Sequence, residues 1–351
     1  MAHVATITID HTKVPGDLTD YVGLIVPDAS AGYSALYALC LEGGGDIRLF
    51  KSDDTTELAR EIVSFSVSAE TGEIHYRYTG TLSSSADTPI HVYADGSSSE
   101  PSASATYGSE AVWPSSYAAV FHMNDASGTL KDSTGNSNNA AVTGTLTYGE
   151  SGEIGDAVGF RTPSTADYAT LTTYPYTGEN TLTWQGWVNQ TSALGSANES
   201  HILHWDSFDT WIDRISGDRC RFGIRNASGV RVILNATTTW TTGVWQMFHA
   251  TYDGSTMRMH MDGVADSTTA SQTGNLEAQT NRGQIGSRTN TTNTPYGGDM
   301  DEIRLLTEAL SANWITTEYN NQNSPSTFYS VAAVAGSSAA QAARRGAVMM
   351  M

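Results

Sequence analysis

Short runs of alternating apolar and polar residues, each closed by a turn signal, recur along this sequence. In residues 257–261 three methionines alternate with Arg258 and His260, and Asp262-Gly263 then turns the chain. Successive side chains of a strand point to opposite faces, so this pattern predicts a strand whose methionines fill a core. Similar runs occur at residues 4–9, 23–26, 46–50, 61–67, 73–79 and 90–93. Short strands at this spacing predict an all-β protein built of β-sandwiches.

Length and composition limit the number of domains and the kinds of partner that we expect. The 351 residues are enough for two domains of ordinary size, and no segment approaches the roughly 20 apolar residues of a membrane helix. The net charge of −19 leaves no basic stripe to neutralise phosphates, so we expect neither nucleic acid nor a membrane as a partner. Cys40 and Cys220 lie in different expected domains, which favours two buried thiols over a disulfide.

Changes in composition divide the chain into four parts. Residues 1–96 carry the first set of strand-like runs and are expected to form a small β-sandwich domain. Residues 97–109 are rich in serine and alanine and are typical of a linker. Residues 110–329 hold a second set of runs and form the second expected domain. Residues 330–351 are rich in alanine, glycine and serine, and we expect an arm that is disordered or ordered only against a partner.

The second domain contains several motifs in sequence. They are residues 119–125 and 131–140, then 182–188, 245–252, 257–263 and 283–287, and finally 298–306 followed by 309–312. This order resembles that of laminin-G-like domains in the concanavalin A-like lectin/glucanase superfamily. The resemblance implies a double-sheet jelly roll that binds sugars or acts as a spacer on cell and virus surfaces. In the first domain, residues 45–50, 56–62 and 86–93 resemble a small β-domain of unknown function that often precedes such modules in secreted and phage proteins.

Asp299, Asp301 and Glu302 are the carboxylates that a glycosidase reaction would need. In a strand, residues i and i+2 share a face at about 6.5–7 Å between Cα atoms, near the roughly 5–5.5 Å between the carboxyls of retaining glycosidases. Glucanases of the same superfamily, however, carry a glutamate at each end of this strand, and position 299 holds aspartate. We therefore expect no enzyme and no catalytic residue. Asp301 is expected to order a neighbouring loop, while Glu302 faces solvent or pairs with an arginine.

A calcium ion is the cofactor that the sequence suggests. The loop at residues 132–138 is rich in carboxylate, hydroxyl and amide oxygens, which Ca²⁺ prefers as ligands. Laminin-G-like domains often hold one Ca²⁺ near a sheet edge, and the resemblance implies Asp132, Asn136 and Asp301 as its ligands here. The alternative is an Asx turn, in which the loop hydrogen-bonds its own backbone.

Exposed aromatic side chains are candidates for sugar binding, because a sugar ring stacks on Trp or Tyr while polar groups hold its hydroxyls. Residues 204–211 break the strand alternation, so we expect an exposed platform of Trp205, Asp206 and Trp211, with Tyr296 as a further ligand-binding residue. The alternative for these aromatics is packing in the core. Three further candidates of the same kind are Tyr174, Tyr176 and Trp240.

The histidines are scattered along the chain rather than clustered in a motif. His201 and His204 lie three positions apart on one predicted strand. Because side chains alternate along a strand, this spacing predicts that the two rings point to opposite faces. We therefore expect no metal ion shared between them.

These features favour a non-enzymatic structural or decoration protein of a virus particle, on head or tail, with an exposed lectin-like domain. The N-terminus lacks the basic start and apolar core of a signal peptide, which assembly in the host cytoplasm onto a virion surface would explain. The expected partners are capsid or tail subunits, further copies of this chain, and a host surface glycan. The alternative is a carbohydrate-binding adhesin or receptor-binding module on a cell or a tail fibre.

Overall fold

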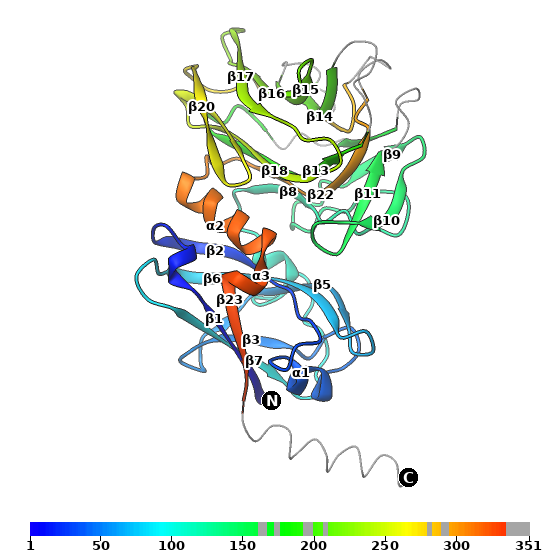
Figure 1. Cartoon of the computed structure of the whole chain (residues 1–351), viewed down its shortest axis with the longest axis vertical. Coiled ribbons are helices and arrows are strands. Elements are labelled where there is room, and N and C mark those ends of the chain that lie inside the picture. Colours follow the sequence, from blue (N-terminus) through cyan, green and yellow to red (C-terminus); the bar gives the residue numbers. More distant parts are fainter. Residues whose placement is uncertain are drawn as a thin grey trace. The chain divides into compact units, whose positions relative to one another are not determined.

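The computed structural model describes residues 1–160, 167–171, 176–191, 199–205, 210–278, 283–288 and 295–334 (Figure 1). These residues form antiparallel strands and a few short helices, in two compact units. The first unit joins Met1–Trp113 with Thr316–Met351, and the second is Pro114–Ile315. Each unit contains two sheets, so the prediction of an all-β protein with two β-sandwich domains is confirmed. No helix among the described residues is long and apolar enough to cross a membrane.

The first unit consists of a larger and a smaller sheet. In the described residues the larger sheet has the strand order β23-β1-β7-β3-β4, and the smaller has the order β2-β6-β5. Alternation along the strands buries one set of side chains, such as Ala5, Ile7 and Ile9 of β1. The strands are β1 (Ala2–Ile9), β2 (Leu18–Ile25), β3 (Arg48–Lys51), β4 (Glu57–Leu58), β5 (Arg60–Ser66), β6 (Thr71–Leu82), β7 (Thr88–Ala94) and β23 (Tyr329–Ala333). The helices are η1 (His11–Lys13), α1 (Ser34–Leu39), η2 (Ser109–Val112), α3 (Pro325–Phe328) and the part of α2 (Ala312–Asn323) that follows Ile315.

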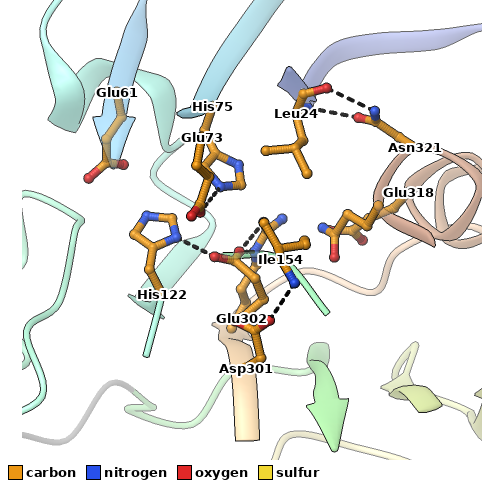
Figure 2. Close-up of polar contacts among 12 residues, drawn as sticks. Leu24, Glu61, Glu73, His75, His122, Ile154, Asp301, Glu302, Glu318 and Asn321 are labelled. Atoms are coloured by element: carbon orange, nitrogen blue, oxygen red, sulfur yellow. Dashed lines mark hydrogen bonds and ion pairs between the residues drawn. The ribbon is translucent and has the colours of Figure 1, made fainter. Parts of the chain in front are cut away.

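A late segment of the chain completes the first unit. Strand β23 pairs with β1, in a register that sets Ile7 opposite Val331. Asn321 of α2 is buried and binds both backbone groups of Leu24, at 2.7 Å to the N–H and 2.9 Å to the carbonyl oxygen (Figure 2). The second unit thus ends at Ile315, earlier than the boundary at 329 that composition suggested. Residues 335–351 of the expected arm lie outside the described residues.

The expected linker at residues 97–109 packs on the first unit. Both guanidinium nitrogens Nη1 and Nη2 of the buried Arg60 bind the carboxylate of Glu100, at 2.8 and 2.9 Å. Arg48 also donates from Nη2 to the Ser99 carbonyl oxygen at 2.9 Å. Such a two-pronged pairing of Arg with a carboxylate fixes geometry as well as charge. The serine-rich composition therefore marked an irregular segment, and the arginines of β3 and β5 determine where it lies.

The second unit is a sandwich of two large antiparallel sheets. Among the described residues, one sheet has the order β10-β11-β22-β13-β18-β19-β20, with β8 also paired to β22, and the other has the order β17-β16-β15-β14-β21-β12-β9. The first comprises β8 (Tyr117–Phe121), β10 (Thr147–Ser151), β11 (Asp156–Phe160), β13 (Leu182–Gln190), β18 (Trp245–Tyr252), β19 (Thr256–Met261), β20 (Val264–Ser271) and β22 (Gly298–Leu306). The second comprises β9 (Ala140–Thr143), β12 (Tyr168–Leu171), β14 (Glu199–Trp205), β15 (Thr210–Ile215), β16 (Arg219–Arg225), β17 (Arg231–Thr239) and β21 (Gly283–Ile285).

The core of the second unit lies between these two sheets. The methionines Met257, Met259 and Met261 all belong to it, as their alternation predicted. Large side chains from both sheets meet there, and the rings of Trp184 and Trp205 are 5.0 Å apart. Both cysteines of the chain are buried and free, as expected.

Candidate functional site

The carboxylates of β22 bind the protein's own groups. Asp301 is fully buried, and its Oδ2 accepts a hydrogen bond of 2.8 Å from the Ile154 backbone N–H (Figure 2). This contact holds the loop between β10 and β11, which confirms the ordering role predicted for Asp301. Glu302 is also buried and binds both His122 and Arg304, whose Nε lies 3.1 Å from Oε2 of Glu302. Pairing of Glu302 with an arginine is therefore confirmed, and its exposure to solvent is wrong.

A β-bulge sets the conformation of Glu302. In the register between β22 and β13, Glu302 and Ile303 together oppose Gly186. Glu302 has a φ of +50°, which is uncommon for a residue with a side chain. A Cβ on Gly186 would lie 2.4 Å from Cδ1 of Ile303, so the bulge requires glycine there. A lone glycine inside a predicted strand is the sequence signal that could have indicated this bulge.

The loop predicted to bind calcium is tied together by its own hydrogen bonds. Each carboxylate oxygen of Asp132 accepts two, at 2.7–3.0 Å, from Val120, Thr134 and Asn138. Asn136 donates from Nδ2 to the carbonyl oxygens of Tyr117 and Ala118 in β8, at 3.0 and 3.3 Å. These bonds match the Asx-turn alternative, while Asp301 binds a different loop. Calcium binding at Asp132, Asn136 and Asp301 stays a prediction.

The aromatic residues predicted to form an exposed platform are buried. Trp205 has no exposed surface, because its ring packs in the core beside Tyr176 and Trp184. Tyr296 is 1% exposed and donates its hydroxyl to the Asp299 carbonyl oxygen at 3.1 Å. The expected exposure of Trp205 is therefore wrong, because the break in alternation did not turn its side chain outward, and Tyr296 is not an exposed candidate either. Tyr176 and Trp240 are buried as well. Asp206 and Tyr174 lie outside the described residues.

The two histidines of β14 lie on the same face of the sheet, so the prediction of opposite faces is wrong. His201 pairs with Asp213 and Leu203 pairs with Ile212, which leaves Ile202 as an extra residue in a bulge. One inserted residue shifts the alternation by one, so positions three apart return to the same side. The ring centroids of His201 and His204 are 5.1 Å apart.

These histidines line a pocket of about 110 Å³ on strands β14 to β17 and at Arg288, which follows β21. Their neighbours Leu203 and Ile212 belong to the core, so the pocket is on the sheet face away from it. Sequence reasoning identified Trp211 as a site residue but missed the rest of this pocket. The residues that line it are Glu199, His201, His204, Trp211, Arg221, Arg231, Ile233 and Arg288.

A charged cluster forms one side of the pocket. Arg221 binds Oε1 of Glu199 through Nη2 at 2.7 Å, and Oδ1 of Asp213 through Nε at 3.0 Å. The Nε2 atom of His201 lies 3.4 Å from Glu199 and 3.6 Å from Asp213. Hydrogen bonding from His201, followed by Arg221, lowers the pKa of Glu199 to about 2. Glu199 is therefore ionised at neutral pH.

Trp211 lies flat between a glycine and two arginines. A Cβ on Gly223 would lie 2.4 Å from Cη2 of Trp211, so the indole covers the space that a larger residue would occupy. The guanidinium carbons of Arg221 and Arg231 lie 5.6 and 6.0 Å from the ring centroid, within range for cation–π attraction. Trp211 is 5% exposed, so it forms part of the pocket wall rather than an open stacking platform.

Two buried polar atoms of the pocket residues have no hydrogen-bond partner within the described part of the chain. They are Nε1 of Trp211 and Nδ1 of His201. Buried polar groups are nearly always paired in folded proteins, and an unpaired one costs about 1–3 kcal/mol. His204 is buried nearby, and burial, followed by electrostatic interaction with His201 and Arg288, lowers its pKa to about 2. His204 is therefore uncharged at neutral pH and suits hydrogen bonding to neutral groups.

Three groups of residues that each lie within one unit are compact enough to hold a metal ion, with possible ligand atoms within 4.8 Å of one another. In the pocket, Arg221 is paired with both carboxylates of such a group, and its positive charge disfavours a cation beside it. The other two groups are on the first unit and are bound by internal hydrogen bonds. The three groups are Glu199 with His201 and Asp213, His3 with Asp54 and His91, and Asp10 with His11 and Asp87.

Comparison with solved structures finds toxin binding domains at low similarity. The binding domain of Paraclostridial Mosquitocidal Protein 1 has a TM-score of 0.46 and 12% identity, over 57% of this chain and 52% of that chain. The binding domain of botulinum neurotoxin serotype G has a TM-score of 0.44 and 12% identity, over 58% and 50%. The binding domain of botulinum neurotoxin serotype D has a TM-score of 0.45 and 13% identity, over 61% and 53%. The chain spans about half the length of these structures.

The sequence of the second unit matches a known family. No curated protein matches the chain. The family described as the concanavalin A-like lectin/glucanases superfamily, of laminin G type, matches residues 163–316. This segment supplies the strands from β12 to β22, which include every pocket residue and most of both sheets. The resemblance inferred from the motifs is confirmed, because residues 163–316 match the model of the concanavalin A-like lectin/glucanase superfamily.

Proposed function

We propose that the second unit is a non-catalytic, lectin-like module that binds a glycan in the pocket on β14 to β17. The observation that carries this proposal is that Trp211 and His201, which line a pocket on the outer sheet face, each have a buried polar atom without a partner among the described residues, namely Nε1 and Nδ1. A sugar hydroxyl can donate and accept hydrogen bonds, so one ligand can satisfy both atoms. The superfamily assignment of residues 163–316 supports the same class of ligand.

The contacts of the β22 carboxylates support binding rather than hydrolysis. A glycosidase acid and its partner must be free to reach the scissile bond from either side. Asp301 instead holds the Ile154 backbone, and Glu302 holds His122 and Arg304. These carboxylates therefore stabilise the second unit through their hydrogen bonds.

The test is a broad glycan array followed by titration calorimetry with each hit. Trp211→Phe removes the indole N–H while keeping an aromatic ring, and we expect a loss of affinity of roughly 2–10-fold, the range for one hydrogen bond. Trp245→Phe is the matched control, because Trp245 is half-buried on β18 in the other sheet. A flat array, or equal affinity of wild type and Trp211→Phe, would reject this pocket as the glycan site.

We also propose a virion surface as the setting in which this module acts, as a decoration or structural protein. The support is the pair of domains noted in the sequence, whose order resembles that of secreted and phage proteins. Capsid or tail subunits and further copies of the chain would then be its partners. Mass spectrometry and electron microscopy of purified particles test the setting. Absence of the chain from particles, with presence on a cell surface, would favour an adhesin instead.

A further inference from the structure

We propose that the pocket on β14 to β17 selects an acidic sugar at the end of a glycan, and that Arg288 binds its carboxylate or sulfate group. This inference rests on the proposed function and specifies the ligand class. The pocket stands out because the chain as a whole carries a net charge of −19. An acidic ligand is repelled by such a protein unless a local group of opposite charge receives it.

The local charge of the pocket is positive. Arg221, Arg231 and Arg288 line it, against the two carboxylates of Glu199 and Asp213, which leaves a formal excess of one positive charge. Arg221 is paired with both carboxylates, so it offsets one of their two negative charges and is not free to attract a ligand. His204 is uncharged near neutral pH because burial lowers its pKa to about 2. The excess charge therefore belongs to the other two arginines.

Arg288 is the arginine that is available to a ligand. It is half-buried, and its guanidinium makes no ion pair or hydrogen bond with any residue that the structure describes. A planar guanidinium matches the two oxygens of a carboxylate, or two oxygens of a sulfate, with parallel hydrogen bonds. Trp211 lies close by with its unpaired Nε1, which can donate to the same ligand.

The size of the pocket indicates how much of a glycan it receives. Sites that enclose a drug-sized ligand have volumes of roughly 300–1,000 Å³. The pocket of about 110 Å³ is smaller, so it accommodates one group of a sugar rather than a chain of sugars. An acidic substituent at the end of a glycan is small enough for this volume.

The experiment compares three soluble ligands by titration calorimetry with the full chain. These are 3′-sialyllactose for a carboxylate, 3′-sulfated lactose for a sulfate, and lactose as the neutral reference. We expect at least one acidic ligand to bind tenfold or more tightly than lactose, and the better one identifies the acidic group. We also expect its affinity to fall when ionic strength rises from about 0.1 M to about 1 M, because the screening length shortens from about 10 Å to about 3 Å.

Arg288→Gln tests the residue directly. We expect at least a tenfold loss for the acidic ligand, which corresponds to about 1.4 kcal/mol, and no change for lactose. Arg288→Lys keeps the positive charge but loses the planar guanidinium that can form two parallel hydrogen bonds. Its affinity for the acidic ligand should therefore lie between those of wild type and Arg288→Gln. Arg258→Gln, which removes a surface arginine paired with Asp253 on the other sheet, should bind as wild type. Thermal unfolding confirms that each variant is folded.

The outcomes separate this inference from the proposed function. Two results would reject the acidic ligand class while retaining glycan binding. One is equal affinity for acidic and neutral ligands, and the other is an Arg288→Gln variant that binds the acidic ligand as wild type does. Failure of all three ligands together with a flat glycan array overturns both.

Discussion

Gly223→Ala should damage the second unit and its pocket together. The added Cβ would lie 2.4, 2.5 and 2.6 Å from three atoms of the Trp211 ring, whereas ordinary contact begins at 3.4 Å. The ring must therefore move by about 1 Å or tilt away from β16. The backbone of Gly223 lies outside the left-handed region, so the clash with Trp211 is the whole effect.

The expected cost is that of overpacking a well-packed site, about 1–3 kcal/mol. For a domain of this size each kcal/mol lowers Tm by roughly 2–4 °C, so differential scanning calorimetry can measure the change. Glycan affinity should fall in the same variant, since Trp211 forms a wall of the pocket. A Gly223→Ala protein with unchanged Tm and unchanged glycan binding would refute this reasoning.

A double-mutant cycle makes the test sharper. Trp211→Ala removes the three ring atoms nearest to the new Cβ. In that background Gly223→Ala should cost almost nothing, so the two changes should be non-additive by about 0.5–3 kcal/mol. Additive costs would show that Gly223 acts through something other than the Trp211 ring.

Three further predictions concern other parts of the chain. Asn321→Ala should destabilise the first unit by roughly 2–5 kcal/mol in chemical denaturation, because it leaves the buried N–H and carbonyl of Leu24 unpaired; an unchanged midpoint would contradict this. His204 has a folded-state pKa of about 2 against an ordinary 6.5, so the unfolded chain binds the proton first and stability should fall as pH drops below about 6.5. His204→Gln should weaken that fall, and an identical pH profile would count against it. If the predicted calcium ion binds, added calcium should raise Tm by more than about one degree, and the rise should be smaller in Asp132→Asn. An unchanged Tm with calcium or EDTA would reject the site.

Local patterns were sufficient to predict the strands and the core. Alternation identified Met257, Met259 and Met261 as core residues, and the structure places all three there. Ile303 and Leu305 also alternate with charged neighbours in the sequence, and both lie in the core. Such predictions succeed because the two-residue period of a strand is a property of the backbone, and burial of one face follows from it.

The candidate site was poorly predicted because it depends on interruptions of that period. The bulge at Ile202 turns His201 and His204 to one face, and no residue type in the sequence signals it. Trp205 was expected to be exposed, yet it is buried against Trp184 from the opposite sheet. Exposure of a side chain depends on what packs against it, and that partner lies far away in sequence.

The sequence by itself determined the class of this protein. Its alternating runs, turn residues and ordered motifs are local, and they specify an all-β chain with a concanavalin A-like second domain. Only the tertiary structure decided which residues meet. Arg221 and Arg288 enter one pocket from β16 and from the segment after β21, and β23 returns to pair with β1. These contacts depend on the register of the strands and on the pairing of segments far apart in the sequence, and at the pocket no local sequence signal indicates either.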